Sequence, residues 1–122
     1  MSAKTAIITG GAGGLGRALD VGLRAKGWVT VPVDLPGQAL EQIPALPDRL
    51  TRACDLTDAA AMRALCEEIR ELRPSIDLVI YNAGVTQIGG FADLPEATHR
   101  RLFEINYFAA VTMAQMLLTD VR

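Results

Sequence analysis

A glycine-rich loop between a predicted strand and a predicted helix is the first candidate for chemistry in this sequence. The stretch ITGGAGGLG covers residues 8–16 and places glycines at positions 10, 14 and 16. These glycines permit a tight turn, a close approach of the backbone to a ligand, and close packing of the helix against the strand. Free N–H groups at the helix N-terminus attract anions, so the loop is typical of a pyrophosphate site.

An acidic residue at the end of the second predicted strand could complete such a site. The carboxylate of Asp34 could accept hydrogen bonds from both hydroxyls of an adenosine ribose. A ribose 2′-phosphate would be repelled there, and Ala12, Gly13 and Leu35 supply no basic group to reverse this preference. The sequence therefore favours NAD over NADP. The alternative interpretation of Asp34 is a surface acid in a turn.

Alternating hydrophobic patterns predict the elements that position these residues. Short apolar or β-branched runs predict strands, whereas apolar residues at every third or fourth position predict helices. The predicted strands are residues 4–10, 28–34, 49–55 and 76–84, and the predicted helices are residues 15–27, 58–73 and 96–121. Residues 38–46 are predicted to form a short helix or a turn. Strands that alternate with helices in this way predict an α/β fold with a doubly wound parallel sheet.

Apolar stripes on two of these helices define part of the expected core. The first stripe consists of Leu15, Ala18, Leu19 and Leu23. The second consists of Met62, Leu65, Ile69 and Leu72, with Thr57 as the expected N-cap of its helix. Pro32 lies inside the second predicted strand and has no N–H to donate, so we expect a bulge or a missing ladder bond there.

Four motifs in order along the chain resemble those of the short-chain dehydrogenase/reductase family. The matching segments are TGGAGGLG at residues 9–16, Asp55-Leu56, YNAG at residues 81–84, and Asn106 in the last predicted helix. Tyr81 stands where the family motif has its first asparagine. The resemblance covers the N-terminal half of the family fold and implies a partial Rossmann-type sheet with strand order 3-2-1-4.

The resemblance also implies roles for individual residues. The implied cofactor-binding residues are Thr9, Gly10, Gly14, Leu15, Gly16, Asp34, Leu35, Asp55, Leu56, Asn82, Ala83 and Gly84. Asn106 matches the asparagine that holds a water in the family's proton relay and is therefore the one implied catalytic residue. Alternatively, Asp55 could only cap the following helix, Asn82 could only tie strands together, and Asn106 could have a purely structural role.

The family's catalytic serine and its Tyr-x-x-x-Lys segment have no counterpart in these 122 residues. The tyrosines, lysines and serines of the sequence are Tyr81, Tyr107, Lys4, Lys26, Ser2 and Ser75. No lysine follows either tyrosine at the required spacing. We therefore expect residues 1–122 to form a single NAD(P)-binding Rossmann domain, truncated before the catalytic segment.

This domain is expected to bind the cofactor of an oxidoreductase that transfers hydride between nicotinamide and an alcohol or ketone, but to be inactive alone. One alternative is a non-catalytic module that binds nucleotides or mediates dimerisation, and another is a truncated reading frame without a function. The predicted fourth strand becomes a sheet edge, and the last predicted helix is strongly apolar. Both features favour a homo-oligomer or association with a missing C-terminal half.

Composition argues against several other classes of function. The net charge is −2 and the sequence contains no run of lysine and arginine, which disfavours nucleic acid and anionic membranes as partners. Without a long apolar span or a secretion signal, we expect a cytoplasmic protein. Cys54 and Cys66 do not form a CxxC motif, and His99 is the only histidine, so free thiols, a solvated histidine and no metal site are expected.

Overall fold

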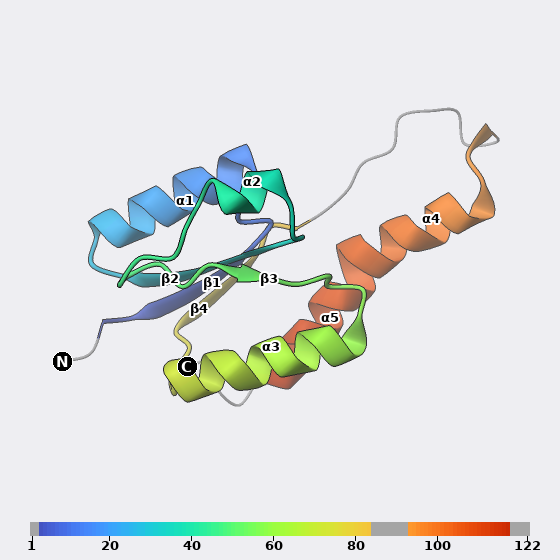
Figure 1. Cartoon of the computed structure of the whole chain (residues 1–122). Helices are drawn as coiled ribbons and strands as arrows, with labels where there is room; N and C mark the ends of the chain where they lie inside the picture. Colours follow the sequence, from blue (N-terminus) through green and yellow to red (C-terminus); the bar gives the residue numbers. More distant parts are fainter. Residues whose placement is uncertain (1–2, 84–92, 118–122) are drawn as a thin grey trace.

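Four parallel strands form the sheet at the centre of this computed structural model, which describes residues 3–83 and 93–117. The strands are β1 (Thr5–Thr9), β2 (Val29–Asp34), β3 (Arg52–Ala53) and β4 (Leu78–Tyr81). Their order across the sheet is β3-β2-β1-β4 (Figure 1). This arrangement confirms the predicted α/β class and the strand order 3-2-1-4.

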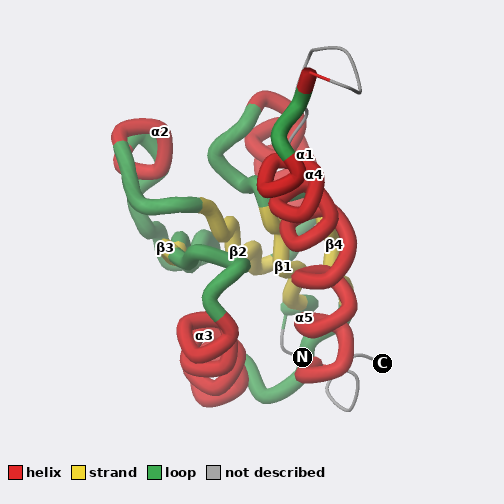
Figure 2. The backbone as a smooth tube through the Cα atoms, turned by 90° about the vertical axis from the view of Figure 1, so that its right-hand side faces the viewer, coloured by secondary structure: helices red, strands yellow, loops and turns green. Residues whose placement is uncertain are grey.

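Helices cover both faces of the sheet. They are α1 (Gly14–Ala25), α2 (Gln38–Glu41), α3 (Ala59–Leu72), α4 (Glu96–Phe103), the π-helical turn η2 (Glu104–Phe108) and α5 (Ala109–Leu117). Figures 1 and 2 show α1 and α2 on one face and α3 and α5 on the other, while α4 leads away from the sheet. None of the described helices is both long and apolar enough to cross a membrane.

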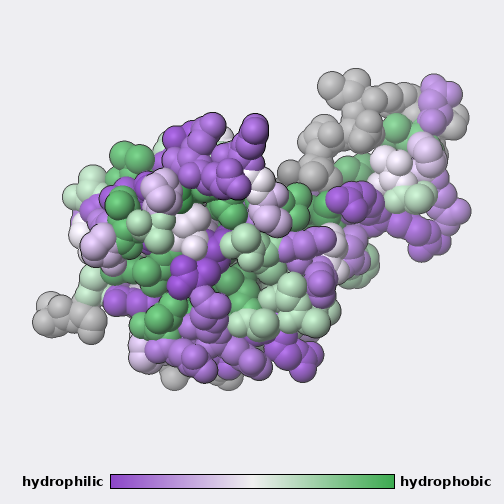
Figure 3. All heavy atoms as spheres, in the orientation of Figure 1, coloured by the Kyte–Doolittle hydropathy of each residue, from purple (hydrophilic) through white to green (hydrophobic). Residues whose placement is uncertain are grey.

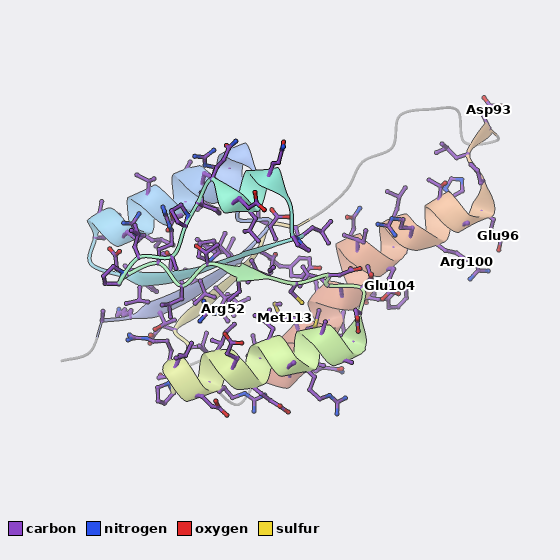
Figure 4. The ribbon with its side chains drawn as sticks, in the orientation of Figure 1. Arg52, Asp93, Glu96, Arg100, Glu104 and Met113 are labelled. Carbon is purple, nitrogen blue, oxygen red and sulfur yellow. The ribbon has the colours of Figure 1, made fainter. Side chains whose placement is uncertain are left out.

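The main hydrophobic core lies between the sheet and the pair formed by α3 and α5. Its buried residues are Ile7, Val31, Val33, Cys54, Met62, Leu65, Cys66, Ile69, Ile76, Ala109, Met113 and Leu117. Met113 points into the space between the sheet and α3 (Figure 4). Figure 3 shows hydrophilic side chains along the outer side of α3, as expected for an amphipathic helix. Both cysteines are buried, and neither forms a disulfide, as expected.

The predicted apolar face of α1 is wrong in part. Leu15 is 64% exposed and Ala18 is also exposed, whereas the buried residues of this helix are Gly16 and Asp20. The Asp20 carboxylate is tolerated in the interior because it accepts a hydrogen bond from the Thr30 hydroxyl and pairs with arginines. Because Asp20 has these partners, the side of α1 that contains Asp20 is buried, and part of the more apolar stripe is exposed.

Pro32 interrupts the pairing between β2 and β3, as expected. The N–H of Leu50 donates to the Thr30 carbonyl at 2.8 Å, and the N–H of Cys54 donates to the Asp34 carbonyl at 2.9 Å. Between these two hydrogen bonds, residue 32 is the residue of β2 whose backbone faces β3. Because it is proline, it has no N–H to donate to β3. β2 remains continuous with β1 on its other side, while β3 is shorter than the predicted strand.

Two helix predictions also need correction. Asp58, not Thr57, is the N-cap of α3, because its carboxylate accepts the Ala61 N–H at 3.1 Å. The stripe at Met62, Leu65 and Ile69 is buried as predicted, but Leu72 is 49% exposed. The last predicted helix is helical over residues 96–117 but contains the π-helical turn η2, and its predicted end lies outside the described residues.

Candidate functional site

A cavity of about 360 Å³ opens where the four strands end. It is lined by Gly10, Gly13, Gly14, Leu15, Val33, Asp34, Leu35, Cys54, Asp55, Leu56, Thr57, Asn82, Ala83, Arg101 and Ile105. Nine of the twelve predicted cofactor-binding residues are in this lining. Thr9 and Gly16 lie buried beside it, and Gly84 lies outside the described residues. The chain thus brings together residues from four separate loops at the edge where doubly wound sheets bind ligands.

The glycine loop has distinct packing constraints at its three predicted positions. Gly10 has a φ of +66°, a conformation that side chains rarely adopt. A Cβ at Gly16 would lie only 2.2 Å from the Gly10 carbonyl oxygen, so α1 can pack against the loop only with glycine there. A Cβ at Gly14 would meet no protein atom within 4 Å. Nothing in the described protein therefore fills the space in front of Gly14, at the N-terminus of α1.

Residues 82 and 83, which follow β4, are hydrogen-bonded to β1 and the glycine loop. The Ala83 N–H donates to the Thr9 hydroxyl at 3.0 Å, and the Asn82 side-chain amide donates to the Gly10 carbonyl at 3.3 Å. Asn82 therefore ties the two loops together while it also lines the cavity. Its structural role and a contact with a ligand are compatible, because its amide oxygen remains an acceptor.

The Asp34 carboxylate is held at the rim of the cavity by backbone donors. One oxygen accepts the Ala12 N–H at 3.0 Å, and the other accepts the Leu35 N–H at 2.8 Å. Each carboxylate oxygen has two acceptor positions, so both oxygens can accept further hydrogen bonds from a ligand. These contacts make Asp34 part of the loop structure, in contrast to an unattached surface acid.

Asp55 forms a turn after β3 and does not cap α3. One oxygen of its carboxylate accepts both the Thr57 hydroxyl, at 2.6 Å, and the Thr57 N–H, at 3.0 Å. These hydrogen bonds, with a smaller contribution from the Arg101 charge, hold the pKa of the Asp55 carboxyl below its usual value. The site therefore presents an ionised acid beside Leu56 at this end of the cavity.

The π-helical turn η2 is attached to the end of β4. The Tyr81 hydroxyl donates to the Ile105 carbonyl at 2.9 Å, and burial together with the Glu104 charge raises the pKa of Tyr81. Ile105 lines the cavity, whereas Asn106 is exposed and is not part of the lining. The catalytic role of Asn106 stays a prediction.

Sequence reasoning missed three residues of the cavity that carry informative chemistry. Arg101 and Ile105 both line it, and Cys54 contributes a buried thiol whose pKa is raised chiefly by desolvation. Arg101 and Ile105 are four positions apart, which places them on one helical face. This spacing was a usable signal, but it does not say which side of the helix turns toward the strands.

The described residues contain no group of three or more histidine, cysteine, aspartate or glutamate side chains that could hold a metal ion. His99 lies half-buried on α4, away from the cavity lining.

Comparison with known proteins decides the family. The family profile described as short chain dehydrogenase matches residues 4–122. The chain belongs to the short-chain dehydrogenase family. Proteins of this family are oxidoreductases that bind NAD or NADP. Tyr81, which stands in place of the first asparagine of the motif that the sequence resembles, donates its hydroxyl to the carbonyl of Ile105 in the cavity lining.

Individual short-chain dehydrogenases show how much of the family fold is present. The chain is 31% identical over 113 residues to the L-2,3-butanediol dehydrogenase of Corynebacterium glutamicum, covering 87% of this chain and 44% of that protein. It is 29% identical over 116 residues to the NAD-dependent glycerol dehydrogenase of Listeria innocua, covering 93% and 46%. A short-chain dehydrogenase structure from Streptomyces avermitilis matches with a TM-score of 0.89 and 28% identity, covering 97% and 44%. The chain therefore spans about half the length of these relatives.

Proposed function

We propose that this chain is the NAD-binding half of a short-chain dehydrogenase. The observation that carries the proposal is the cavity at the strand ends, where open space faces Gly14 at the N-terminus of α1. The loop N–H groups there would hold the pyrophosphate, because a helix N-terminus attracts anions. Asp34 would accept hydrogen bonds from the adenosine ribose, and Asp55 and Leu56 would contact the adenine.

The preference for NAD over NADP rests on the charge at Asp34. A ribose 2′-phosphate would lie next to the Asp34 carboxylate. Two backbone N–H groups hold this carboxylate in place, so the carboxylate could not easily rotate away from the phosphate. Arg101 is the one basic residue in the described lining, and its charge contributes to the lowered pKa of Asp55. The similar protein from Listeria innocua is an NAD-dependent glycerol dehydrogenase, which agrees with this preference.

In the complete family reaction, nicotinamide would exchange a hydride with an alcohol or ketone. Residues 1–122 supply Asn106 of the family's catalytic set but not the serine or the Tyr-x-x-x-Lys segment. We therefore propose that the chain binds cofactor but does not transfer hydride by itself. Activity would need those groups from further sequence or from another polypeptide.

Replacement of Asp34 by alanine tests the cofactor assignment. Titration calorimetry of both proteins with NAD and NADP should show a large loss of NAD affinity and a smaller change, or a gain, for NADP. Circular dichroism should first establish that the variant is folded, because Asp34 also accepts the Ala12 N–H. A greater loss for NADP than for NAD would contradict the proposal.

A second candidate function is a non-catalytic module that associates with another copy or with a C-terminal half. It is favoured by the large apolar side chains exposed on α4 and η2, where Phe103 is 64%, Tyr107 56% and Phe108 52% exposed. NAD binding without association would argue against this candidate, whereas association without NAD binding would favour it.

A further inference from the structure

Arg101 is the only cationic side chain among the described residues that line the cavity. It has no hydrogen bond or ion pair with another described residue, although the cavity holds two carboxylates. Its neighbour Arg100 differs, because its guanidinium donates twice to Glu96, at 2.9 and 2.7 Å. Figure 4 shows Arg100 and Glu96 on the part of α4 that extends away from the sheet. Of the two arginines, only Arg101 is therefore available to a ligand in the cavity.

The surroundings of Arg101 indicate which part of a ligand it would meet. Arg101 and Asp55 line the same cavity, and the Arg101 charge contributes to the lowered pKa of Asp55 after the larger effect of the Thr57 hydrogen bonds. Leu56 and Ile105 supply apolar lining. The space in front of Gly14, which suits a pyrophosphate, belongs to the glycine loop instead. A planar cation in a cavity that also has apolar lining is suited to a flat aromatic group.

We propose that the guanidinium of Arg101 lies against the face of the adenine ring and makes adenine recognition partly a cation–π contact. This inference rests on the proposed binding of NAD. Guanidinium groups stack on aromatic faces and are only weakly hydrated, so the contact costs little desolvation.

A contact with adenine and a contact with phosphate predict different results for ligands that lack phosphate. Adenosine carries the aromatic ring but no charge, whereas NAD carries both. Removing a stacking contact should weaken both ligands by the same factor. Removing a phosphate contact should weaken the binding of NAD but not that of adenosine. This loss of NAD affinity should be smaller at high salt, because the interaction is electrostatic.

The test compares the unaltered chain with Arg101→Gln and with the matched control Arg100→Gln. Dissociation constants for NAD come from calorimetry, and those for adenosine from NMR titration, which follows millimolar binding. Arg101→Gln should weaken NAD and adenosine alike, by about threefold to thirtyfold. For each ligand, the ratio of the dissociation constants of Arg101→Gln and the unaltered chain should be the same at low and high salt. Arg100→Gln should change neither constant by more than about twofold, since its side chain is exposed and paired with Glu96.

Several outcomes would overturn the inference. It fails if Arg101→Gln leaves both constants unchanged, if only NAD is weakened, or if the unaltered chain binds NAD but not adenosine. If Arg100→Gln weakens binding as much as Arg101→Gln, the effect is one of general charge and the inference is wrong. Failure of the unaltered, folded chain to bind NAD would instead overturn the proposed function, and this inference with it.

Discussion

Two glycines of the loop, Gly16 and Gly14, have different packing surroundings. Gly16 is required by the protein itself, because a Cβ there would approach the Gly10 carbonyl oxygen to 2.2 Å. Gly14 faces space that no described protein atom occupies within 4 Å. The sequence predicted different roles for these two glycines, and the packing around Gly16 confirms its close helix contact. A direct role for Gly14 in binding a ligand stays a prediction.

Gly16→Ala should destabilise the chain by about 1–3 kcal/mol, because the added methyl group overpacks the contact between α1 and the loop. Gly14→Ala is the matched control within the same loop. It should leave the free energy of unfolding within about 1 kcal/mol of the unaltered chain, since alanine also favours a helix. It should nevertheless weaken NAD binding. Urea unfolding measures the first effect, and equal stability losses for both variants would contradict this distinction.

Asp34 and Asp55 show what the sequence could and could not predict about the site. The family resemblance implied that both acids bind the cofactor, and both line the same cavity. The sequence could not identify their hydrogen-bond partners, Thr57 and the N–H groups of Ala12 and Leu35. Those contacts depend on turn geometry that many sequences can adopt.

At the scale of elements, the junction between β4 and η2 is the feature that sequence patterns did not predict. A π-helical turn widens the helix by one residue and often occurs at functional sites. Here it coincides with the Tyr81 hydroxyl, which donates to the Ile105 carbonyl at 2.9 Å. Hydrophobic periodicity predicts that a helix exists but does not detect one inserted residue.

Tyr81→Phe should lower the free energy of unfolding by about 0.5–1.5 kcal/mol, the usual net value of one hydrogen bond. The fold should survive, because the ring is retained. NAD affinity should also fall if this bond holds Ile105 in the cavity wall. Thermal unfolding and NAD titration measure the two effects, and a variant indistinguishable from the unaltered chain in both would contradict this role.

The same tyrosine predicts a dependence of stability on alkaline pH. Burial and the Glu104 charge raise the pKa of Tyr81 in the folded chain above its ordinary value of about 10. Above that pH the unfolded chain loses the proton first, so the folded state loses stability as pH rises toward the folded pKa. Tyr81→Phe should remove this part of the decline. Urea unfolding of both proteins between pH 8 and about 11 would measure this difference. Identical pH profiles for the unaltered chain and Tyr81→Phe would contradict the prediction.

Element boundaries were less predictable than element order. Alternation of strands and helices sufficed for the sheet order once the family resemblance was added, and Pro32 correctly indicated a missing bond. The buried face of α1 was misjudged because Asp20 gains Thr30 and arginine partners from distant parts of the chain. Thr57 and Asp58 are both good N-caps, so only the geometry of the β3 turn decides between them.

At the scale of the whole molecule, the sheet edge at β4 and the exposed aromatic side chains of α4 and η2 predict association. Among the described residues β4 pairs only with β1, and all four of its residues are half-buried. Phe103 and Phe108 expose more than half of their surface. Surfaces of this kind bind partners or aggregate.

Replacement of Phe103 and Phe108 by serine should therefore shift the chain toward the monomer. Sedimentation velocity over a range of concentrations measures this shift, and Arg63→Ser on the exposed side of α3 is a suitable control. The core should be unaffected, because neither phenylalanine belongs to it. An unaltered chain that is monomeric at all concentrations would show that this surface does not mediate self-association.

The central claim is that NAD binds in the cavity at the ends of the four strands. Its most direct test is an NMR titration of the isotopically labelled chain with NAD, following backbone amide signals. We expect saturable shifts at Gly14, Leu15 and Gly16 and at Asp34 and Asp55. Little change is expected at Arg24 and Glu67, which lie outside the lining. A folded chain with no saturable shifts, or with shifts confined to residues outside the cavity, would contradict it.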